Sequence, residues 1–227
     1  MRLRRPRLPR RRTLGRVLLG TVTGYILTWA AVSVAVLLMS ESARASAERG
    51  RPGWPSVPGV HNFAQVDSHL WRGAAPDPEG YRNLAGLGVR TVVDLRAEDL
   101  PSSVRELPGR AGLAVVRIPM RDGQAPTAEQ VSRFMAAVHG AKGPVFVHCG
   151  AGVGRTGTMS AAYLVRTGQA GAAAATRRSL AVGPPTLEQV AFMRGLRGDG
   201  AERPHTALVA LSRIADSPRR SWARLND

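Results

Sequence analysis

Residues 145–157 constrain the fold more than any other stretch of the chain. They begin with the short apolar run Val145-Phe146-Val147, which is typical of a buried strand. A loop with three glycines follows, and we expect a helix to begin near Thr156. A strand that turns through glycines into a helix presents backbone N–H groups at the helix N-terminus, where anions bind. The stretch therefore predicts an α/β domain with an anion site at the end of one strand.

Strands and helices alternate through the rest of the chain. We expect one or two edge strands in residues 63–72 and further strands at 90–95, 114–118 and 144–148. Helices are expected at 77–87, 98–107, 127–138, 156–166, 170–182, 186–197 and 204–215. Two of these helices begin with capping boxes, Thr127-x-x-Gln130 and Thr186-x-x-Gln189. This alternation predicts a mostly parallel central sheet flanked by helices.

An uncharged run at residues 17–39 precedes this domain and follows eight arginines in residues 2–16. About 20 apolar residues suffice for a helix to cross a bilayer. Residues 41–51 hold only three arginines, and the end richer in arginine stays in the cytoplasm. We therefore expect a single-pass cell-membrane protein with a cytoplasmic N-terminus and the folded domain outside the cytoplasm.

Other interpretations of the run stay open. A cleavable signal peptide would end at Ala45-Ser46-Ala47, although its apolar region is usually only ~7–15 residues. Arg11-Arg12 fits a twin-arginine signal, and a buried core helix is also apolar. The length of the run favours an anchor. The expected organisation is a basic tail (1–16), a membrane helix (17–39), a proline-containing linker (40–60), the main domain (61–200) and a C-terminal helix and tail (201–227).

Composition excludes several classes of protein. The single cysteine, Cys149, rules out an intramolecular disulfide and a cysteine zinc cluster, and no metal or cofactor is implied. Net charge is +16, but the eight arginines of the tail leave 24 basic against 16 acidic residues. Aromatic residues make up only 5%, and no nucleic-acid-binding motif occurs. We therefore expect no specific nucleic-acid partner.

The loop after Cys149 has the chemistry of a phosphate site. Its small residues let successive N–H groups form an anion-binding nest. Arg155 adds a planar fork for two phosphate oxygens. This field favours the thiolate of Cys149, which is a nucleophile toward bound phosphorus. We expect the loop residues to bind the substrate phosphate: His148, Gly150, Ala151, Gly152, Val153 and Gly154.

Two neighbours complete this picture. Thr156 is placed to donate a hydroxyl hydrogen bond to the sulfur, which would stabilise the thiolate. His148 is expected to orient the loop through hydrogen bonds rather than to act as a base. The N–H groups and Arg155 would meet the dispersed negative charge of the transition state.

The pattern His-Cys-x-x-Gly-x-x-Arg-Thr at residues 148–156 resembles the signature of cysteine-dependent protein tyrosine and dual-specificity phosphatases. Residues 70–73, 87–96 and 118–122 also resemble bacterial members of that superfamily, so the resemblance covers about residues 61–197. It implies a protein tyrosine phosphatase-like fold, hydrolysis through a cysteinyl-phosphate intermediate, and no metal.

Less specific interpretations of the loop are weaker. A lone cysteine is often an apolar core residue. A nucleotide-binding loop would need Gly-Lys-Ser/Thr or the dinucleotide glycine spacing, and neither occurs here. Rhodanese-like domains generally lack the Arg-Thr pair found at Arg155 and Thr156.

The leaving group needs a proton donor, and Asp122 is our candidate. It follows the predicted strand 114–118, at the sheet edge where open α/β domains place their sites. The family's acid loop also resembles residues 119–126. A turn with Gly123 would be an ordinary alternative for this aspartate. Asp94 is the second candidate, although its place within a strand suggests a structural role.

The substrate and some neighbouring residues stay open. Superfamily members that act on phosphoinositides or inositol polyphosphates often carry basic residues where this loop has Ala151, Val153 and Gly154. Phosphotyrosine or phosphoserine/threonine proteins, or small phosphoesters, are therefore favoured over lipid or inositol phosphates. A non-catalytic phosphate-binding module is the remaining alternative. Gln189 is expected to cap its helix, and Arg72 and Arg96 to pair with acids near the site.

Overall fold

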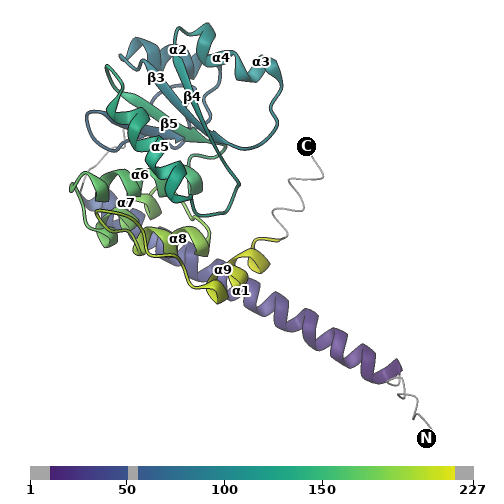
Figure 1. Cartoon of the computed structure of the whole chain (residues 1–227). Coiled ribbons are helices and arrows are strands. Elements are labelled where there is room, and N and C mark those ends of the chain that lie inside the picture. The colour runs from purple at the N-terminus through teal and green to yellow at the C-terminus, as the bar shows by residue number, and fades with distance from the viewer. Residues whose placement is uncertain (1–10, 51–55, 218–227) are drawn as a thin grey trace, which may run out of the picture.

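The computed structural model describes residues 11–50 and 56–217 (Figure 1). A five-stranded sheet in the order β1-β2-β5-β3-β4 forms its centre. The strands are β1 (Ala64–Gln65), β2 (Leu70–Ala74), β3 (Thr91–Arg96), β4 (Ala114–Met120) and β5 (Val145–Cys149). Only β1 pairs antiparallel, so the prediction of a mostly parallel sheet is confirmed.

Helices cover both faces of this sheet, as predicted. The described helices are α1 (Arg11–Gly50), α2 (Pro78–Gly86), α3 (Ser102–Arg105), α4 (Leu107–Arg110), α5 (Ala128–His139), α6 (Gly154–Arg166), α7 (Ala172–Leu180), α8 (Leu187–Arg194) and α9 (Thr206–Ala215). One apolar cluster joins the sheet to α5, α6, α7 and α8, and a second joins it to α2. The strand that ends in Cys149 lies at the centre of the sheet, and all five of its residues are buried.

Local signals account for most element boundaries. Asp77 caps α2, and both predicted capping boxes form at the starts of α5 and α8. The helix predicted at 98–107 instead forms the two short helices α3 and α4. Proline lacks the N–H that a helix interior needs, so Pro101 and Pro108 each lie at the start of a helix. Strand β4 runs to Met120, two residues beyond the predicted end at 118.

The expected linker differs most from the structure. Residues 40–50, predicted to be linker, continue helix α1 to Gly50. No proline interrupts this part, and Ser40 and Ala43 are buried against the domain. The Ser40 hydroxyl donates to the carbonyl oxygen of Leu180 at 2.7 Å, and Arg44 donates to the carbonyls after α7. Tertiary packing therefore extends the helix beyond its apolar run. The rest of the linker lies partly outside the described residues.

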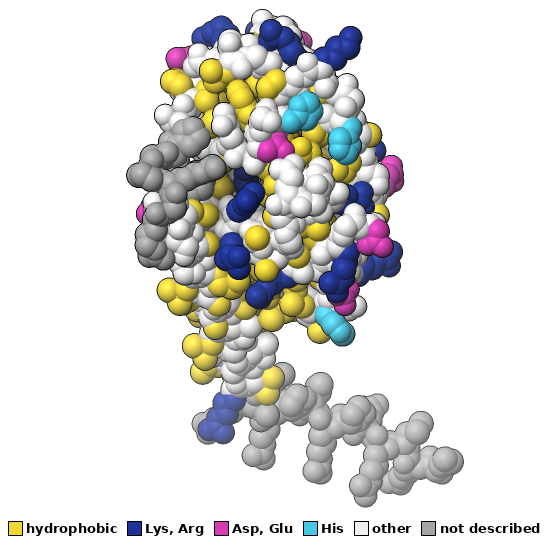
Figure 2. Space-filling view, turned by 90° about the vertical axis from the view of Figure 1, so that its left-hand side faces the viewer, with side chains coloured by type: hydrophobic (Ala, Val, Ile, Leu, Met, Phe, Trp, Pro, Cys, Tyr) yellow, Lys and Arg dark blue, Asp and Glu magenta, His cyan; other side chains and the backbone are white. Residues whose placement is uncertain are grey.

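The other end of α1 projects from the domain and carries apolar side chains on its surface (Figures 1 and 2). Val17, Leu18 and Leu19 are each more than 60% exposed. The helix is long and apolar enough to cross a membrane between Gly15 and Glu48. Helix α9 packs against it, where the Tyr25 hydroxyl donates to the carbonyl of Ile214 at 3.2 Å. The basic tail at residues 1–10 and the C-terminal residues 218–227 lie outside the described residues.

Candidate active site

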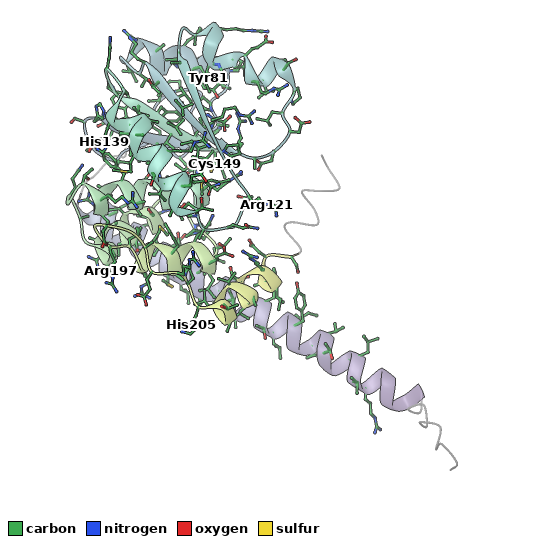
Figure 3. All side chains as sticks on the ribbon, viewed as in Figure 1. Tyr81, Arg121, His139, Cys149, Arg197 and His205 are labelled. Carbon is green, nitrogen blue, oxygen red and sulfur yellow. The ribbon has the colours of Figure 1, made fainter. Side chains whose placement is uncertain are left out.

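Cys149 is the last residue of β5 and precedes the loop to α6 (Figure 3). It is only 3% exposed, whereas Gly150 and Ala151 beside it are exposed and Val153 and Gly154 are half-buried. The sulfur therefore lies at the bottom of a loop whose next residues are open to solvent. Figure 3 also labels Arg121, on the loop that follows β4.

The carbonyl groups of the loop are all bound by donors behind it. The Gly150 carbonyl accepts from Ala75 N at 3.0 Å, and the Ala151 carbonyl accepts from Asn62 Nδ2 at 2.9 Å. Arg72 Nη2 donates to the Gly152 carbonyl at 2.6 Å. Because a trans peptide holds its C=O and N–H on opposite sides, the N–H groups of residues 151–153 turn the other way. They have no acceptor within the described part of the chain, which is the arrangement an anion nest requires.

Gly152 is the position where this loop needs glycine. Its φ is +72°, and a Cβ there would collide with the backbone of Gly73 and Ala74 in β2. Only glycine allows both the left-handed conformation and this close approach. The contact holds the loop against the neighbouring strand.

Arg155 lies in the first turn of α6 and is almost fully buried. Its Nη1 donates to Glu98 Oε2 at 2.8 Å and to the Met120 carbonyl at 3.1 Å. Asp122 Oδ1 lies 3.2 Å from Nε, although that contact does not have hydrogen-bond geometry. Burial would lower the pKa of Arg155, but Glu98, Cys149 and Asp122 outweigh it and raise the pKa. The guanidinium therefore stays charged beside the loop.

Arg72 is a second buried arginine behind the loop. The prediction that it pairs with an acid is wrong, because its described partners are the carbonyls of Gly152 and Val153. Burial lowers its pKa to about 10, and the nearby Cys149 partly opposes this shift. The side chain therefore positions the loop and places a positive charge near the sulfur.

His148 was expected to bind the substrate phosphate together with the loop residues, but its side chain is fully buried behind the loop and does not face a ligand. One ring nitrogen lies 3.4 Å from the Tyr81 hydroxyl, and the other lies 3.2 Å from the carbonyl of Cys149. Burial is the main cause that lowers its pKa to about 4. The ring is therefore neutral near pH 7, and its contacts with Tyr81 and the Cys149 carbonyl suit the expected role of orienting the loop.

Two aspartates were candidates for the proton donor, and the structure separates them. Asp122 has a side chain that is 55% exposed beside Arg155. Asp94 is buried and binds Arg96 at 2.9 Å, which confirms the predicted pairing of Arg96 with an acid. Burial would raise the pKa of Asp94, but hydrogen bonds from Arg96 outweigh burial and lower it. Asp94 is therefore held as a structural carboxylate.

Thr156 does not make the predicted contact. Its hydroxyl is buried and has no hydrogen-bond partner among the described residues, Cys149 included. Helix α6 begins at Gly154, two residues before the predicted start, so Thr156 lies within its first turn. The hydroxyl is a buried donor without an acceptor in this state.

Gln189 caps α8 as predicted, because its Oε1 accepts from Thr186 N at 3.0 Å. The same side chain also packs against the loop after Cys149. A Cβ added to Gly154 would lie 2.5 Å from Gln189 Oε1, so only glycine leaves room for this contact. Its Nε2 donates to the Gln124 carbonyl in the loop that carries Asp122. Capping and contact with the site therefore coexist.

Four partners of the site were not predicted from the sequence: Asn62, Ala75, Tyr81 and Glu98. None belongs to a local motif. Asn62 and Ala75 bind the loop itself, Tyr81 contacts His148 in β5, and Glu98 binds Arg155 in α6. Within the described residues, no group of three or more His, Cys, Asp or Glu side chains is arranged to hold a metal ion.

The sequence is similar to a known protein family and to several known proteins. A family model described as DSP-PTPase phosphatase fused to NAD+ kinase matches residues 55–195. The probable chloroplastic NAD kinase 2 of Oryza sativa subsp. japonica is 32% identical over 158 residues, which are 65% of this chain and 16% of that protein. The tyrosine-protein phosphatase cdc-14 of Caenorhabditis elegans is 37% identical over 78 residues, 34% of this chain and 11% of that protein. The chain thus spans less than a fifth of these relatives.

Solved structures show the same fold. TpbA from P. aeruginosa, in a cysteine-to-serine variant bound to phosphotyrosine, is 25% identical with a TM-score of 0.51; the match covers 71% of this chain and 94% of TpbA. The core catalytic domain of the PP-IP phosphatase SIW14 from S. cerevisiae has a TM-score of 0.55 at 18% identity, covering 72% and 96%. The chain belongs to the family described as DSP-PTPase phosphatase fused to NAD+ kinase, within the cysteine-dependent tyrosine and dual-specificity phosphatase-like proteins.

Proposed function

We propose that the chain hydrolyses phosphate monoesters through a covalent cysteinyl-phosphate intermediate. The observation that carries the proposal is that the loop carbonyls bind donors behind the loop, which leaves the N–H groups of residues 151–153 without an acceptor among the described residues. Arg155 adds a buried positive charge at the same place. Together these groups can bind a phosphate dianion and stabilise its transition state.

Hydrolysis proceeds in two steps, formation and breakdown of the cysteinyl phosphate. In the first, the thiolate of Cys149 attacks phosphorus, the bond from phosphorus to the leaving oxygen breaks, and Asp122 protonates that oxygen. In the second, water attacks the cysteinyl phosphate, Asp122 accepts the proton of that water, and the thiolate leaves from phosphorus. No step uses a metal ion.

We infer that the substrates are phosphorylated proteins or small aryl phosphates. The exposed rim residue Ala151 and its half-buried neighbours Val153 and Gly154 offer no cation for additional phosphate groups. TpbA, the relative that is described in complex with phosphotyrosine, supports an aryl ester. A substrate panel of phosphotyrosine, phosphoserine and inositol phosphates tests this inference, and a preference for inositol phosphates would overturn it.

We propose that α1 anchors the enzyme in the cell membrane, with the tail in the cytoplasm and the phosphatase domain outside. The exposed apolar surface of α1 and the eight arginines before it support this topology. Protease added to intact spheroplasts should digest the domain, which should resist extraction by high salt. Protection from protease would refute the orientation, and a free domain with a new N-terminus near Glu48 would identify a signal peptide.

The activity itself is tested on the full chain in detergent. It should hydrolyse an aryl phosphate in the presence of a chelator and should be inhibited by vanadate, which mimics the five-coordinate transition state. Activity that requires an added divalent ion would contradict the proposed mechanism.

A further inference from the structure

The loop that carries Asp122, residues 121–126, is held by the first turn of α8. We refer to it as the acid loop. The Thr186 hydroxyl donates to the Gly123 carbonyl at 2.7 Å, and Gln189 Nε2 donates to the Gln124 carbonyl at 3.2 Å. Ala125 N donates to Glu188 Oε1 at 3.1 Å. Three consecutive acid-loop residues are therefore bound by one helical turn.

Glu188 differs from the other two because it also binds a third element. Its second oxygen, Oε2, accepts from Arg213 Nε of α9 at 3.1 Å. Its backbone N–H donates to the Ser212 hydroxyl, also in α9, at 3.0 Å. The carboxylate is only 5% exposed, whereas the Arg213 side chain is 48% exposed. A buried carboxylate needs such donors, so Glu188 is stable here only while it joins the acid loop to α9.

Asp122 has little to hold it in place by itself. More than half of its side chain is exposed, and its contact among the described residues is the 3.2 Å approach of Oδ1 to Arg155 Nε. The position of its carboxyl group therefore depends on the restraint of the residues that follow it. A general acid must stay within hydrogen-bond reach of the leaving oxygen, so movement of the loop reduces proton transfer.

We propose that Glu188 is a positioning residue for catalysis, which holds the acid loop against α8 and α9 so that Asp122 faces the leaving group. It does not touch the substrate; it acts through Ala125 on the loop. This inference rests on the proposed role of Asp122 as the acid. It assigns to α9, a helix beyond the recognisable phosphatase region, a part in the chemistry of the site.

Two variants of the full chain separate the contacts. Glu188→Met removes both acceptor oxygens at similar volume, whereas Glu188→Gln keeps a carbonyl oxygen for Ala125 N. The half-exposed Arg213 can then turn to solvent. Glu106→Met is the matched control. It breaks the exposed ion pair between Arg110 and Glu106, whose atoms lie 2.7 Å apart and which does not involve the acid loop. Each variant is assayed with phenyl phosphate, a poor leaving group, and with dinitrophenyl phosphate, a good one.

Glu188→Met should lower kcat/KM, which reports the step that releases the leaving group, about tenfold for phenyl phosphate, the loss expected for one charge-assisted hydrogen bond. It should change kcat/KM for dinitrophenyl phosphate less than about twofold. Glu188→Gln should restore most of the loss, and the control should match the wild type. An equal loss on both substrates would mean a merely structural role and would overturn the proposal. Retained phenyl phosphate activity in Glu188→Met would overturn it as well.

A second set of measurements distinguishes failure of the Glu188 proposal from failure of the proposed role of Asp122 as the acid. In an Asp122→Asn background, Glu188→Met should add no further dependence on the leaving group. If Asp122→Asn itself shows none, the proposed acid is wrong, and hydrogen exchange then decides the positioning claim. Amide exchange in residues 121–126 should rise in Glu188→Met and not in Glu106→Met; unchanged exchange would overturn the claim. If Glu188→Met does not fold, Arg213→Gln takes its place with the same exchange readout.

Discussion

The buried histidine behind the loop predicts a pH-dependent loss of stability. Burial lowers the pKa of His148 to about 4 in the folded chain, against an ordinary value of 6.5. Between these values the unfolded chain binds a proton that the folded chain does not, so the free energy of unfolding falls as pH falls. From pH 7 to pH 5 the two values give a loss of about 2 kcal/mol from this residue.

The assay is denaturant unfolding of the full chain in detergent at pH 7 and pH 5. His148→Gln removes the titrating ring and should lose about 2 kcal/mol of that pH dependence, although it is less stable at pH 7 because the contact with Tyr81 changes. His139→Gln, at an exposed position at the end of α5, is the control and should behave as the wild type. The same pH dependence in His148→Gln and wild type would refute the burial argument.

Three further predictions concern the loop, the acid and α1. Arg72→Lys should lower kcat about tenfold or more, because a lysine lacks the planar guanidinium whose Nη2 donates to both the Gly152 and Val153 carbonyls; unchanged steady-state rates would contradict this. Asp122→Asn should slow phenyl phosphate ~10²–10⁴-fold and dinitrophenyl phosphate far less, and equal losses would point to another donor. A chain that begins at residue 50 should melt about 5 °C or more below one that begins at residue 33, because it lacks the Ser40 and Arg44 hydrogen bonds; equal melting temperatures would show that α1 contributes nothing to the domain.

The elements around the loop could be predicted because their signals are local. The apolar run before Cys149, the glycines after it and the capping boxes each act over a few residues, and the structure places β5, α5, α6 and α8 close to the predicted positions. Asp122 could be placed near Arg155 for a different reason: the carboxyl ends of the strands of a parallel sheet meet at one edge.

The supporting contacts could not be predicted because they join distant segments. Asn62 and Arg72 reach the loop from β2 and the residues before it, and Glu98 reaches Arg155 across 57 residues of sequence. No short-range pattern distinguishes these polar residues from exposed ones. The continuation of α1 past residue 40 has the same cause: its Ser and Ala residues resemble a linker until α7 provides a surface to pack on.

The central claim is that Cys149 carries the phosphoryl group during turnover. Rapid acid quenching of the full chain during hydrolysis of an aryl phosphate labelled on phosphorus should trap label on the protein, and peptide mapping should place it on Cys149. Cys149→Ser should lose turnover and the trapped label while still binding vanadate. Label on another residue, or full turnover by Cys149→Ser, would contradict the proposed mechanism.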